Sequence, residues 1–366
     1  PLIKSGSDFR EADYHEALVL IAKRCQSIGA KYGKDAIGVA VSDRYTNEEA
    51  FAIKKMAETM GAKIFSMNNR ASGIADVLGF DASPNTIDEL LSTNMILAVG
   101  FNTTDNPVIE LKMKQVAEAG AKVVLVNPED YVQHIDFLNK AVYTKNDLSF
   151  LKEVAKAVVD SGRCAGVDGY EEFAASVKDV TVSDDAKAVA DMYLEAKKAM
   201  IVFNQNLITT EAASLLADIA LVSGHIGTPR DGILQVKAKN NSQGLVDLGI
   251  TAGAEELEGV KALVVFGEEA DIDTDALEFL AVSDTHMTAL AAKADVVIPG
   301  TGFASTDGTY TNTERRLQLV QAAIEEDVEL ANWEIAAEIA HVFEVDYEWE
   351  NTEDISVAMN DEVPAY

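Results

Sequence analysis

The sequence predicts an α/β protein with two lobes whose sheets are mostly parallel. Short apolar segments alternate with amphipathic segments of about ten residues or more, which is typical of parallel strands joined by crossover helices. A Gly-containing break at 161–169 interrupts this alternation, and 366 residues are enough for two or three domains. We predict one discontinuous lobe made of 1–62 and 165–325, a second lobe of 63–164 inserted into it, and an acidic helix and tail over 326–366.

Capping signals and apolar runs locate the individual elements in chain order. The spacing of a capping box occurs at Asp13/Glu16, Thr46/Glu49 and Thr86/Glu89. Helices are predicted over 13–32, 46–60, 107–119, 147–159, 210–222 and 333–343, with a short one from Thr86 and a mostly helical stretch over 170–198. Strands are predicted over 35–41, 63–65, 95–99, 122–126, 200–203, 263–266, 280–282 and 295–298.

Composition and charge exclude several classes of function. Asp and Glu number 61 against 30 Lys and Arg, a formal net charge of −31, whereas nucleic acids and anionic membrane surfaces attract clustered cations. No apolar run approaches the ~20 residues of a membrane-spanning helix. We therefore expect no nucleic acid partner and no direct membrane insertion.

Two cysteines, Cys25 and Cys164, are too few for a disulfide framework or a four-thiolate cluster. This indicates a reducing compartment and places any iron–sulfur cluster on another segment or chain. Cys25 lies on an apolar helix face and is predicted to be core, whereas Cys164 is predicted to be a loop thiol. No leader typical of secretion is present, and the sequence opens at Pro1, so we expect either processing or a piece of a longer protein.

Two Gly-containing loops are candidates for anion binding. Residues 99–105 follow a predicted strand and precede a predicted helix, a position where anions bind. Because this loop has a single glycine, we interpret it as an ordinary strand-to-helix turn. Residues 223–232 are richer in glycine and carry His225 and Arg230; here an anion cradle and a plain helix-to-strand turn remain equally open.

Two further loops are rich in hydrogen-bonding or basic side chains. The amide-rich run at 240–244 suits a polar heterocycle, but we favour bracing of neighbouring loops. The paired arginines at 315–316 suit a phosphate or carboxylate, and again we favour local pairing with acidic side chains. The five histidines lack metal-ligand spacing, and no G-x-S-x-G motif occurs. We therefore assign no catalytic residue and no metal ligand.

Taken in order, several segments resemble the molybdopterin oxidoreductase superfamily. They are the opening 1–37, TNEEAF, GFNTTDNPV, KVVLVNPE, LLADIALVSGHIGTPRDGI, NNSQGLVDLG and ADVVIPGTGFASTDGTYTNTERRLQ. The resemblance spans nearly the whole chain and is greatest to the large iron–sulfur subunit of NADH:quinone dehydrogenase and to formate dehydrogenase catalytic subunits. It implies two Rossmann-like lobes of the formate dehydrogenase/dimethyl sulfoxide reductase-like kind.

The resemblance also identifies departures from active relatives. The stretch that corresponds to the metal-ligating Cys or selenocysteine reads NNRASG at 68–73, without Cys or His, so it offers no thiolate to molybdenum or tungsten. Lys237 stands where formate dehydrogenases have an arginine, which removes a bidentate fork. Glu129 stands in place of the arginine of a D-P-R motif, and Lys145 in place of a glycine that lets the main chain approach a ligand closely.

These departures lead to a main hypothesis and an alternative. The main hypothesis is a scaffold domain of a redox-complex subunit, of the NADH dehydrogenase large-subunit type, with a degenerate cofactor cleft. Electrons would then pass through iron–sulfur clusters on a missing N-terminal segment or a partner. The partners would be other subunits of a redox complex, in the cytoplasm or at the inner membrane face. The alternative is an active molybdenum or tungsten bis-pterin oxidoreductase of the formate dehydrogenase type.

The main hypothesis assigns no cofactor to this chain, and the cofactor implied by the alternative is molybdopterin guanine dinucleotide. The resemblance carries its contacts over to Gly100, Asn102, Gly224, Gly227, Lys237, Asn240, Asn241, Gln243, Gly308 and Asn312. Arg70 and Lys237 would be the nearest cations. Without a cofactor these residues are turn glycines and loop-bracing amides, which is the interpretation that we favour.

Overall fold

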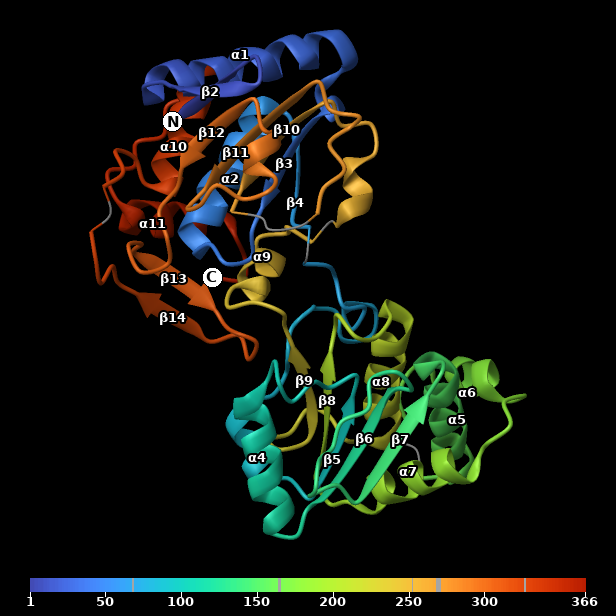
Figure 1. Cartoon of the computed structure of the whole chain (residues 1–366). Helices are drawn as coiled ribbons and strands as arrows, with labels where there is room; N and C mark the ends of the chain where they lie inside the picture. Colours follow the sequence, from blue (N-terminus) through green and yellow to red (C-terminus); the bar gives the residue numbers. More distant parts are fainter. Residues whose placement is uncertain (68, 164–165, 252, 268–270, 326) are drawn as a thin grey trace. The chain divides into compact units, whose positions relative to one another are not determined.

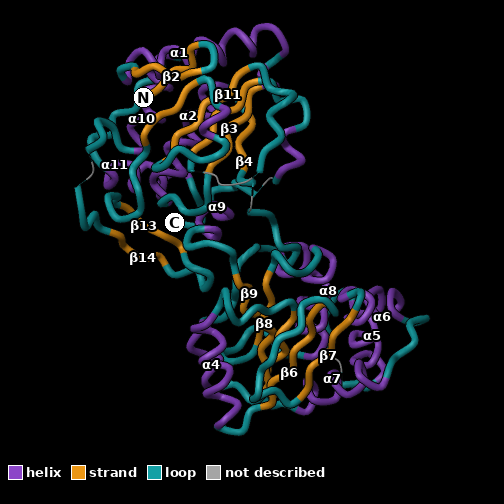
Figure 2. Tube along the Cα trace, viewed as in Figure 1, coloured by secondary structure: helices purple, strands orange, loops and turns teal. Residues whose placement is uncertain are grey.

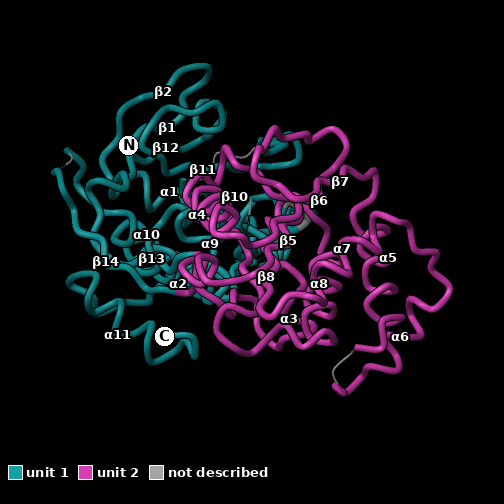
Figure 3. Tube along the Cα trace, turned by 90° about the horizontal axis from the view of Figure 1, so that it is seen from below, with its two compact units in different colours: residues 1–70, 239–312, 316–366 teal, residues 71–238, 313–315 magenta. Residues whose placement is uncertain are grey.

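The chain folds into two compact units, as a computed structural model shows. The structure describes residues 1–366 except 68, 164–165, 252, 268–270 and 326. Unit 1 comprises 1–70, 239–312 and 316–366, and unit 2 comprises 71–238 and 313–315 (Figure 3). Both units contain a largely or wholly parallel sheet with helices, which confirms the predicted α/β class.

A seven-stranded sheet forms the centre of unit 1 (Figure 1). The strands lie in the order β2 (Asp8–Glu11), β1 (Leu2–Ser5), β12 (Val296–Pro299), β11 (Phe279–Asp284), β10 (Ala262–Phe266), β3 (Ile37–Val41) and β4 (Lys63–Phe65). From β12 to β4 all neighbours are parallel, whereas β1 and β2 pair antiparallel. Every residue of β3 and β10 is buried, as expected for strands covered on both faces.

In the described part of the chain, helices and a separate hairpin complete unit 1. The helices are α1 (Tyr14–Tyr32), α2 (Asn47–Met60), α9 (Ser242–Asp247), α10 (Asn332–Val342) and α11 (Thr352–Glu362), with the 3₁₀ turns η1 (Lys34–Ala36), η3 (Ala254–Leu257) and η4 (Ala291–Lys293). The hairpin consists of β13 (Gly308–Thr311) and β14 (Leu317–Val320). The predicted capping box of Thr46 and Glu49 opens α2, and Cys25 is buried in the core as predicted.

Unit 2 contains a wholly parallel five-stranded sheet. Its order is β7 (Lys140–Thr144), β6 (Lys122–Pro128), β5 (Met95–Val99), β8 (Ala199–Asn204) and β9 (Gly232–Val236). The helices are α3 (Ala75–Leu78), α4 (Pro107–Glu118), α5 (Asp147–Asp160), α6 (Tyr170–Val177), α7 (Asp184–Glu195) and α8 (Thr210–Ser223), with the 3₁₀ segment η2 (Ile87–Ser92). The short helix predicted from Thr86 therefore forms as a 3₁₀ segment.

The central strand β5 shows how the sheet of unit 2 is covered on both faces. Met95, Leu97 and Val99 pack with α5, α7 and α8 in one core cluster. Ile96 and Ala98 point to the other face and pack with α4. Figure 2 shows α4 on one side of the strands and α5 and α7 on the other. The continuous apolar run of β5 follows from this double covering.

The structure divides the chain at 238/239 rather than at the predicted 164/165. Residues 199–236 remain in unit 2 because β8 pairs with β5, with Leu97 opposite Ile201, and β9 pairs with β8. Residues 327–366 do not stand apart as an acidic tail, because α10 and α11 pack into the core of unit 1. The sequence pattern predicts β8 and α10 but not the partners against which they pack, and it does not predict β9 or α11.

Several elements of the structure were not predicted from the sequence, namely β1, β2, β7, β9, β13, β14, α3, α9 and α11. Only Val142 is buried in β7, and β9 directly follows a Gly-rich turn, so neither has the pattern of a strand bounded by polar residues. Asn68 and Cys164 lie outside the described residues. In the part of the chain that the structure describes, no helix combines the length and apolar character needed to span a bilayer.

Candidate functional site

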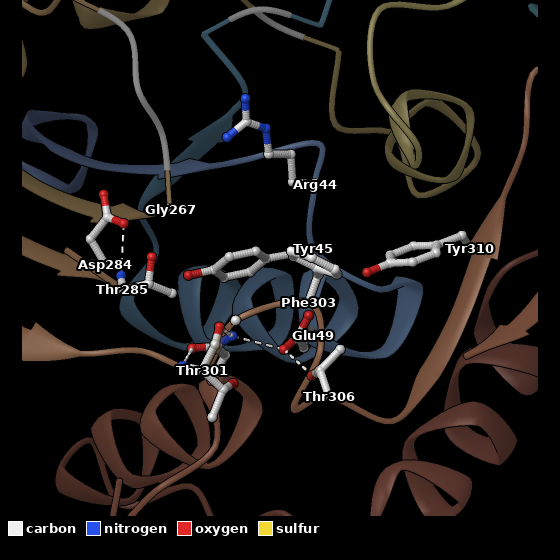
Figure 4. Close-up of a pocket in the computed structure, with 12 residues that line it drawn as sticks. Arg44, Tyr45, Glu49, Gly267, Asp284, Thr285, Thr301, Phe303, Thr306 and Tyr310 are labelled. Carbon is white, nitrogen blue, oxygen red and sulfur yellow. Dashed lines mark hydrogen bonds between the residues drawn. The ribbon is translucent and has the colours of Figure 1, made fainter. Parts of the chain in front are cut away.

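A pocket of unit 1 lies at the carboxyl edge of its parallel strands. Chain order reverses between β3 and β10, since β4 follows on one side and β11 and β12 on the other. Such a reversal opens a crevice in which ligands of α/β proteins bind. The loops after β3, β10, β11 and β12 all contribute to the pocket, which has a volume of about 140 Å³ (Figure 4).

Aromatic and polar side chains line this pocket together. Tyr45 and Tyr310 extend across it, with Arg44 on one side of their rings and Glu49 on the other (Figure 4). Phe303 also lines it and is 81% exposed. A planar ligand with hydrogen-bonding edges suits a site of this composition.

Glu49 forms the base of the pocket and positions its other residues. The carboxylate is buried and accepts hydrogen bonds from the Thr46 main-chain N–H (2.8 Å), Thr306 Oγ1 (2.7 Å) and Asn332 Nδ2 (2.8 Å). Burial raises the pKa of Glu49, and these hydrogen bonds oppose that effect. Because the carboxylate already accepts these bonds, Glu49 holds the loops in place rather than receiving a ligand.

Thr301, like Tyr45 and Tyr310, places in this pocket a buried hydroxyl without a hydrogen-bond partner among the described residues. Its main-chain N–H donates to Asn332 Oδ1 (2.9 Å), and its carbonyl accepts from Asn332 Nδ2 (3.0 Å). The side chain is 8% exposed, and Oγ1 has no hydrogen-bond partner among the residues that the structure describes. A buried hydroxyl is costly when unpaired, so it favours a ligand that can pair with it.

The predicted amides of unit 1 brace loops around the pocket. Asn241 Nδ2 donates to the Tyr45 carbonyl (2.8 Å), and its Oδ1 accepts from the Thr311 N–H (2.8 Å). Asn240 Nδ2 donates to the Arg44 carbonyl (3.2 Å). This is the bracing role that the sequence favours for 240–244, and it fixes the main chain on which Arg44 and Tyr45 stand.

The remaining predicted residues of unit 1 also make local contacts. Gln243 is buried, and its Nε2 donates to Asp247 (3.0 Å). Gly308 has a φ of +142°, and a Cβ there would lie 2.6 Å from Glu48 Oε2, so glycine is needed for this close approach. Asn312 Oδ1 accepts from the Arg316 N–H (2.9 Å) and closes the turn of the hairpin.

In unit 2, the predicted glycines do not come together. Gly100 follows β5 at the carboxyl edge of the sheet, whereas Gly224 and Gly227 follow α8 and precede β9 at the amino edge. Gly224 ends α8 with a φ of +78°, which identifies it as a helix C-cap. Asn102 closes its own turn, because Oδ1 accepts from the Thr104 N–H (2.9 Å) and Nδ2 donates to Asp105 (2.6 Å).

Gly100 shows that the crevice beside β5 is filled by protein. Unit 2 reverses its chain order between β5 and β8, and the loop after β8 lies against Gly100. A Cβ on Gly100, whose φ is +60°, would lie 2.7 Å from Ile208 Cγ2. The place where a ligand of unit 2 would be expected is therefore closed by residues 207–208.

Gly100→Ala is expected to lower the free energy of unfolding by about 2–4 kcal/mol, because it adds left-handed strain and a clash with Ile208. Gly162→Ala is the matched control, since Gly162 has a φ of +66° but no atom within 4 Å of the new Cβ. Its expected loss is about 1–2 kcal/mol. Urea unfolding measures both, and equal losses would contradict the close packing at Gly100.

Lys237 belongs to a buried polar cluster in unit 2. Its side chain is 1% exposed, and Nζ lies 3.3 Å from Asp81 Oδ1 and 3.0 Å from Gln205 Oε1. Asp81 in turn accepts from the Ser72 N–H and from Ser72 Oγ, both at 2.7 Å. Burial raises the pKa of Asp81, but Lys237 and the bonds from Ser72 outweigh burial and leave this pKa below its ordinary value.

Asp81 was not predicted from the sequence. Asp81 lies in the loop that follows α3, and no spacing rule connects it with Lys237, which follows 156 positions later. The cluster matters for the site because Ser72 belongs to the stretch 68–73, where the resemblance places the metal ligand. Among the described residues no group of three or more His, Cys, Asp or Glu side chains could hold a metal ion.

The neighbouring residues of that stretch are also engaged within their own units. In unit 1, Asn69 Nδ2 donates to the carbonyls of Ser242 (3.0 Å) and Ile250 (3.3 Å). In unit 2, Ser214 Oγ donates to the carbonyl of Gly73 (2.7 Å). Arg70 also has an interaction partner.

Comparisons with known proteins identify relatives of this chain. In sequence, the chain is 25% identical to the F420-dependent formate dehydrogenase 2 subunit alpha of Methanococcus maripaludis, over 93% of this chain and 61% of that protein. It is 24% identical to formate dehydrogenase H of Escherichia coli, over 97% of this chain and 61% of that protein. The chain thus spans about three fifths of the length of these relatives.

Solved structures show the same fold. Acetylene hydratase from Pelobacter acetylenicus matches with a TM-score of 0.77 at 13% identity, over 97% of this chain and 62% of that one. A chain of the formyltransferase/hydrolase complex from Methylorubrum extorquens matches with a TM-score of 0.62 at 14% identity, over 93% of this chain and 98% of that one. The sequence pattern described as molybdopterin oxidoreductase matches residues 1–342. Because this match covers nearly the whole sequence, the chain belongs to the molybdopterin oxidoreductase family.

Proposed function

We propose that this chain is a scaffold domain of a redox-complex subunit, of the NADH dehydrogenase large-subunit type, and that it binds no catalytic metal. The observation that carries the proposal is the contact of Ser72 with Asp81 and of Asp81 with Lys237. Ser72 lies in the stretch where the resemblance places the metal ligand, and Lys237 stands where formate dehydrogenases have an arginine. Both side chains contact Asp81. Electrons would pass through clusters on other segments or subunits.

The family's cofactor fits this chain only in part. The pocket of unit 1 fits a planar, hydrogen-bonding portion of such a ligand, because Tyr45 and Tyr310 flank it and the lining residue Thr301 has a buried Oγ1 without a partner among the described residues. The stretch 69–73 does not fit the metal, since Asn69, Arg70, Ala71, Ser72 and Gly73 include no thiolate or imidazole. We therefore assign no redox step to this chain's own residues.

Elemental and pterin analysis of the full-length protein tests the scaffold role. Molybdenum and tungsten are measured by mass spectrometry, and pterin by the fluorescence of its oxidised form, with formate dehydrogenase H of Escherichia coli prepared in parallel as the positive control. We expect metal and guanylated pterin far below one equivalent per chain. One equivalent of either metal together with guanylated pterin would overturn the proposal.

An active molybdenum or tungsten enzyme is the second candidate, favoured by the unpaired Thr301 hydroxyl in the unit 1 pocket and by relatives named as formate dehydrogenases. This candidate requires formate-dependent reduction of a viologen dye. The activity should disappear when cells are starved of molybdate and tungstate. A metal-replete preparation that does not reduce the dye would argue against it.

A further inference from the structure

The outer strand of the β13–β14 hairpin has an uncovered edge. β13 is the partner of β14, and no second strand lies against β14 among those that the structure describes. Leu317 is 52% exposed and Leu319 is 75% exposed. Proteins usually protect such an edge with charged residues, proline, a bulge or a covering segment, and β14 itself carries neither lysine nor proline.

The register of the hairpin determines which way the main-chain N–H and C=O groups of Leu317 and Leu319 point. The Asn312 N–H donates to the Arg316 carbonyl (3.0 Å), and these two residues lie opposite each other. Hydrogen-bonded pairs alternate along an antiparallel ladder, so Gln318 and Val320 face β13. The N–H and C=O groups of Leu317 and Leu319 therefore point away from β13, toward the uncovered edge.

Further apolar side chains belong to the same ribbon. The Ile324 N–H donates to the Ala304 carbonyl (3.1 Å), which continues the pairing beyond β13 and β14. Ile324 is 56% exposed, and Phe303, next to Ala304, is 81% exposed. We refer to Phe303, Leu317, Leu319 and Ile324 as the ribbon patch. Leu317 and Leu319 lie on the unpaired edge itself, and exposed apolar residues on such an edge are typical of a protein interaction site.

The charge differs between the two ends of the ribbon, because Arg315 and Arg316 precede β14 whereas acidic residues follow the ribbon. After Arg316 the sequence contains no Lys or Arg, and Asp and Glu remain frequent up to Glu362. Glu325 and Asp327 follow the ribbon directly and are exposed. A basic segment would therefore be attracted to this region. A second copy of this chain would be repelled, because each chain carries a formal net charge of −31.

We propose that β14 binds an extended strand of a basic partner protein, with aliphatic residues at alternate positions and Lys or Arg at the end that lies toward Glu325 and Asp327. Its main chain pairs with Leu317 and Leu319, and its aliphatic side chains pack beside theirs. This inference rests on the scaffold role proposed above and names the contact through which the scaffold holds a neighbour.

The test uses the full chain and the synthetic peptide KKVTVTVKK as probe. Hydrogen-exchange mass spectrometry should show that the peptide slows exchange in 315–321 and leaves exchange in α4 unchanged.

Leu319→Pro removes only an outward N–H, so the pairing of β13 with β14 survives. The affinity for the peptide, measured by calorimetry, should fall about tenfold. Leu319→Val keeps that N–H and should bind like the native chain. Unchanged exchange, or equal affinity of the proline variant, overturns the proposal.

Further control experiments test whether the binding depends on the charge of the peptide, whether the edge binds a second copy of the chain, and whether the variants still fold. The acidic peptide EEVTVTVEE should bind more weakly by about tenfold, and equal binding overturns the basic partner. Sedimentation that shows dimers abolished by Leu319→Pro would assign the edge to a second copy and overturn the proposal. Leu317→Lys replaces the proline variant if that variant melts early, with Leu111→Lys on α4 as control, because Leu111 is 65% exposed. Metal analysis of the same samples tests the scaffold role separately.

Discussion

Asp81→Ala is expected to lower the free energy of unfolding of unit 2 by about 3–5 kcal/mol, because it leaves the Lys237 ammonium buried without its charge partner. The Lys237 side chain is 1% exposed, so water cannot replace the lost carboxylate. Ser72 would also lose the acceptor of its N–H and its hydroxyl. Urea unfolding followed by circular dichroism measures the loss.

Two control variants test whether the loss of stability comes from the buried ion pair. Asp88→Ala removes a partner of Lys112 at 2.6 Å, but the Asp88 side chain is 78% exposed, so the expected loss is below about 1 kcal/mol. Asp81→Asn combined with Lys237→Met removes both charges and keeps an acceptor for Ser72, so it should recover most of the stability. If Asp81→Ala and Asp88→Ala cost the same, the buried pair does not stabilise unit 2.

The same pair predicts a pH dependence. The pKa of Asp81 is lower in the folded chain than its ordinary value, which is about 3.9 in an unfolded chain. The stabilisation is therefore complete above pH ~4 and is lost as the pH falls through the lower, folded pKa. The variant Asp81→Asn with Lys237→Met should show a shallower loss of stability in acid than the native chain.

Removal of the residues after Phe343 is expected to destabilise unit 1 by about 5 kcal/mol, since three buried side chains are lost at about 1.5–3 kcal/mol each. Ile355 is 0% exposed, Met359 3% and Val363 6%. Ser356 Oγ also donates to the buried Glu48 (2.7 Å), which would lose this donor. Hydrogen-exchange mass spectrometry should show faster exchange in α2 and β13, and unchanged exchange in β5 and β8 of unit 2.

Two alanine variants compare a buried position with an exposed position in this segment. Ile355→Ala should cost about 2–5 kcal/mol because it leaves a cavity. Val357→Ala on the same helix should cost less than about 0.5 kcal/mol, since Val357 is 64% exposed. A truncated chain as stable as the native one would show that the C-terminal segment is an accessory arm rather than part of the core.

Local features are predicted well from the sequence, and long-range partners poorly. Thr46 and Glu49 are correctly identified as a capping box, because both residues belong to one helix start. That Glu49 also accepts from Thr306 and Asn332, 257 and 283 positions away, depends on the arrangement of the strands. The same limit explains why Lys237 is predicted as a cofactor contact while its partner Asp81 is overlooked.

The unit boundary is misplaced for a related reason. A Gly-containing break at 161–169 resembles a domain linker. Residues 199–236 nevertheless belong to unit 2, because β8 pairs with β5, and the local composition of the sequence does not predict this pairing. The candidate pocket is likewise predicted only in part. The bracing role of Asn240 and Asn241 is expected from the sequence, whereas Thr301 and Tyr310 lie in a segment that resembles the family but are not identified individually as site residues.

The discontinuity of unit 1 has a consequence for biosynthesis. β3 cannot pair with β10 until residue 266 has been made, whereas 71–238 contain every strand of the unit 2 sheet. Unit 2 can therefore fold on the ribosome before the sheet of unit 1 is complete. During that time the apolar surfaces of β3, α2 and β4 remain uncovered. The first 70 residues are consequently the segment that chaperones must shield during translation.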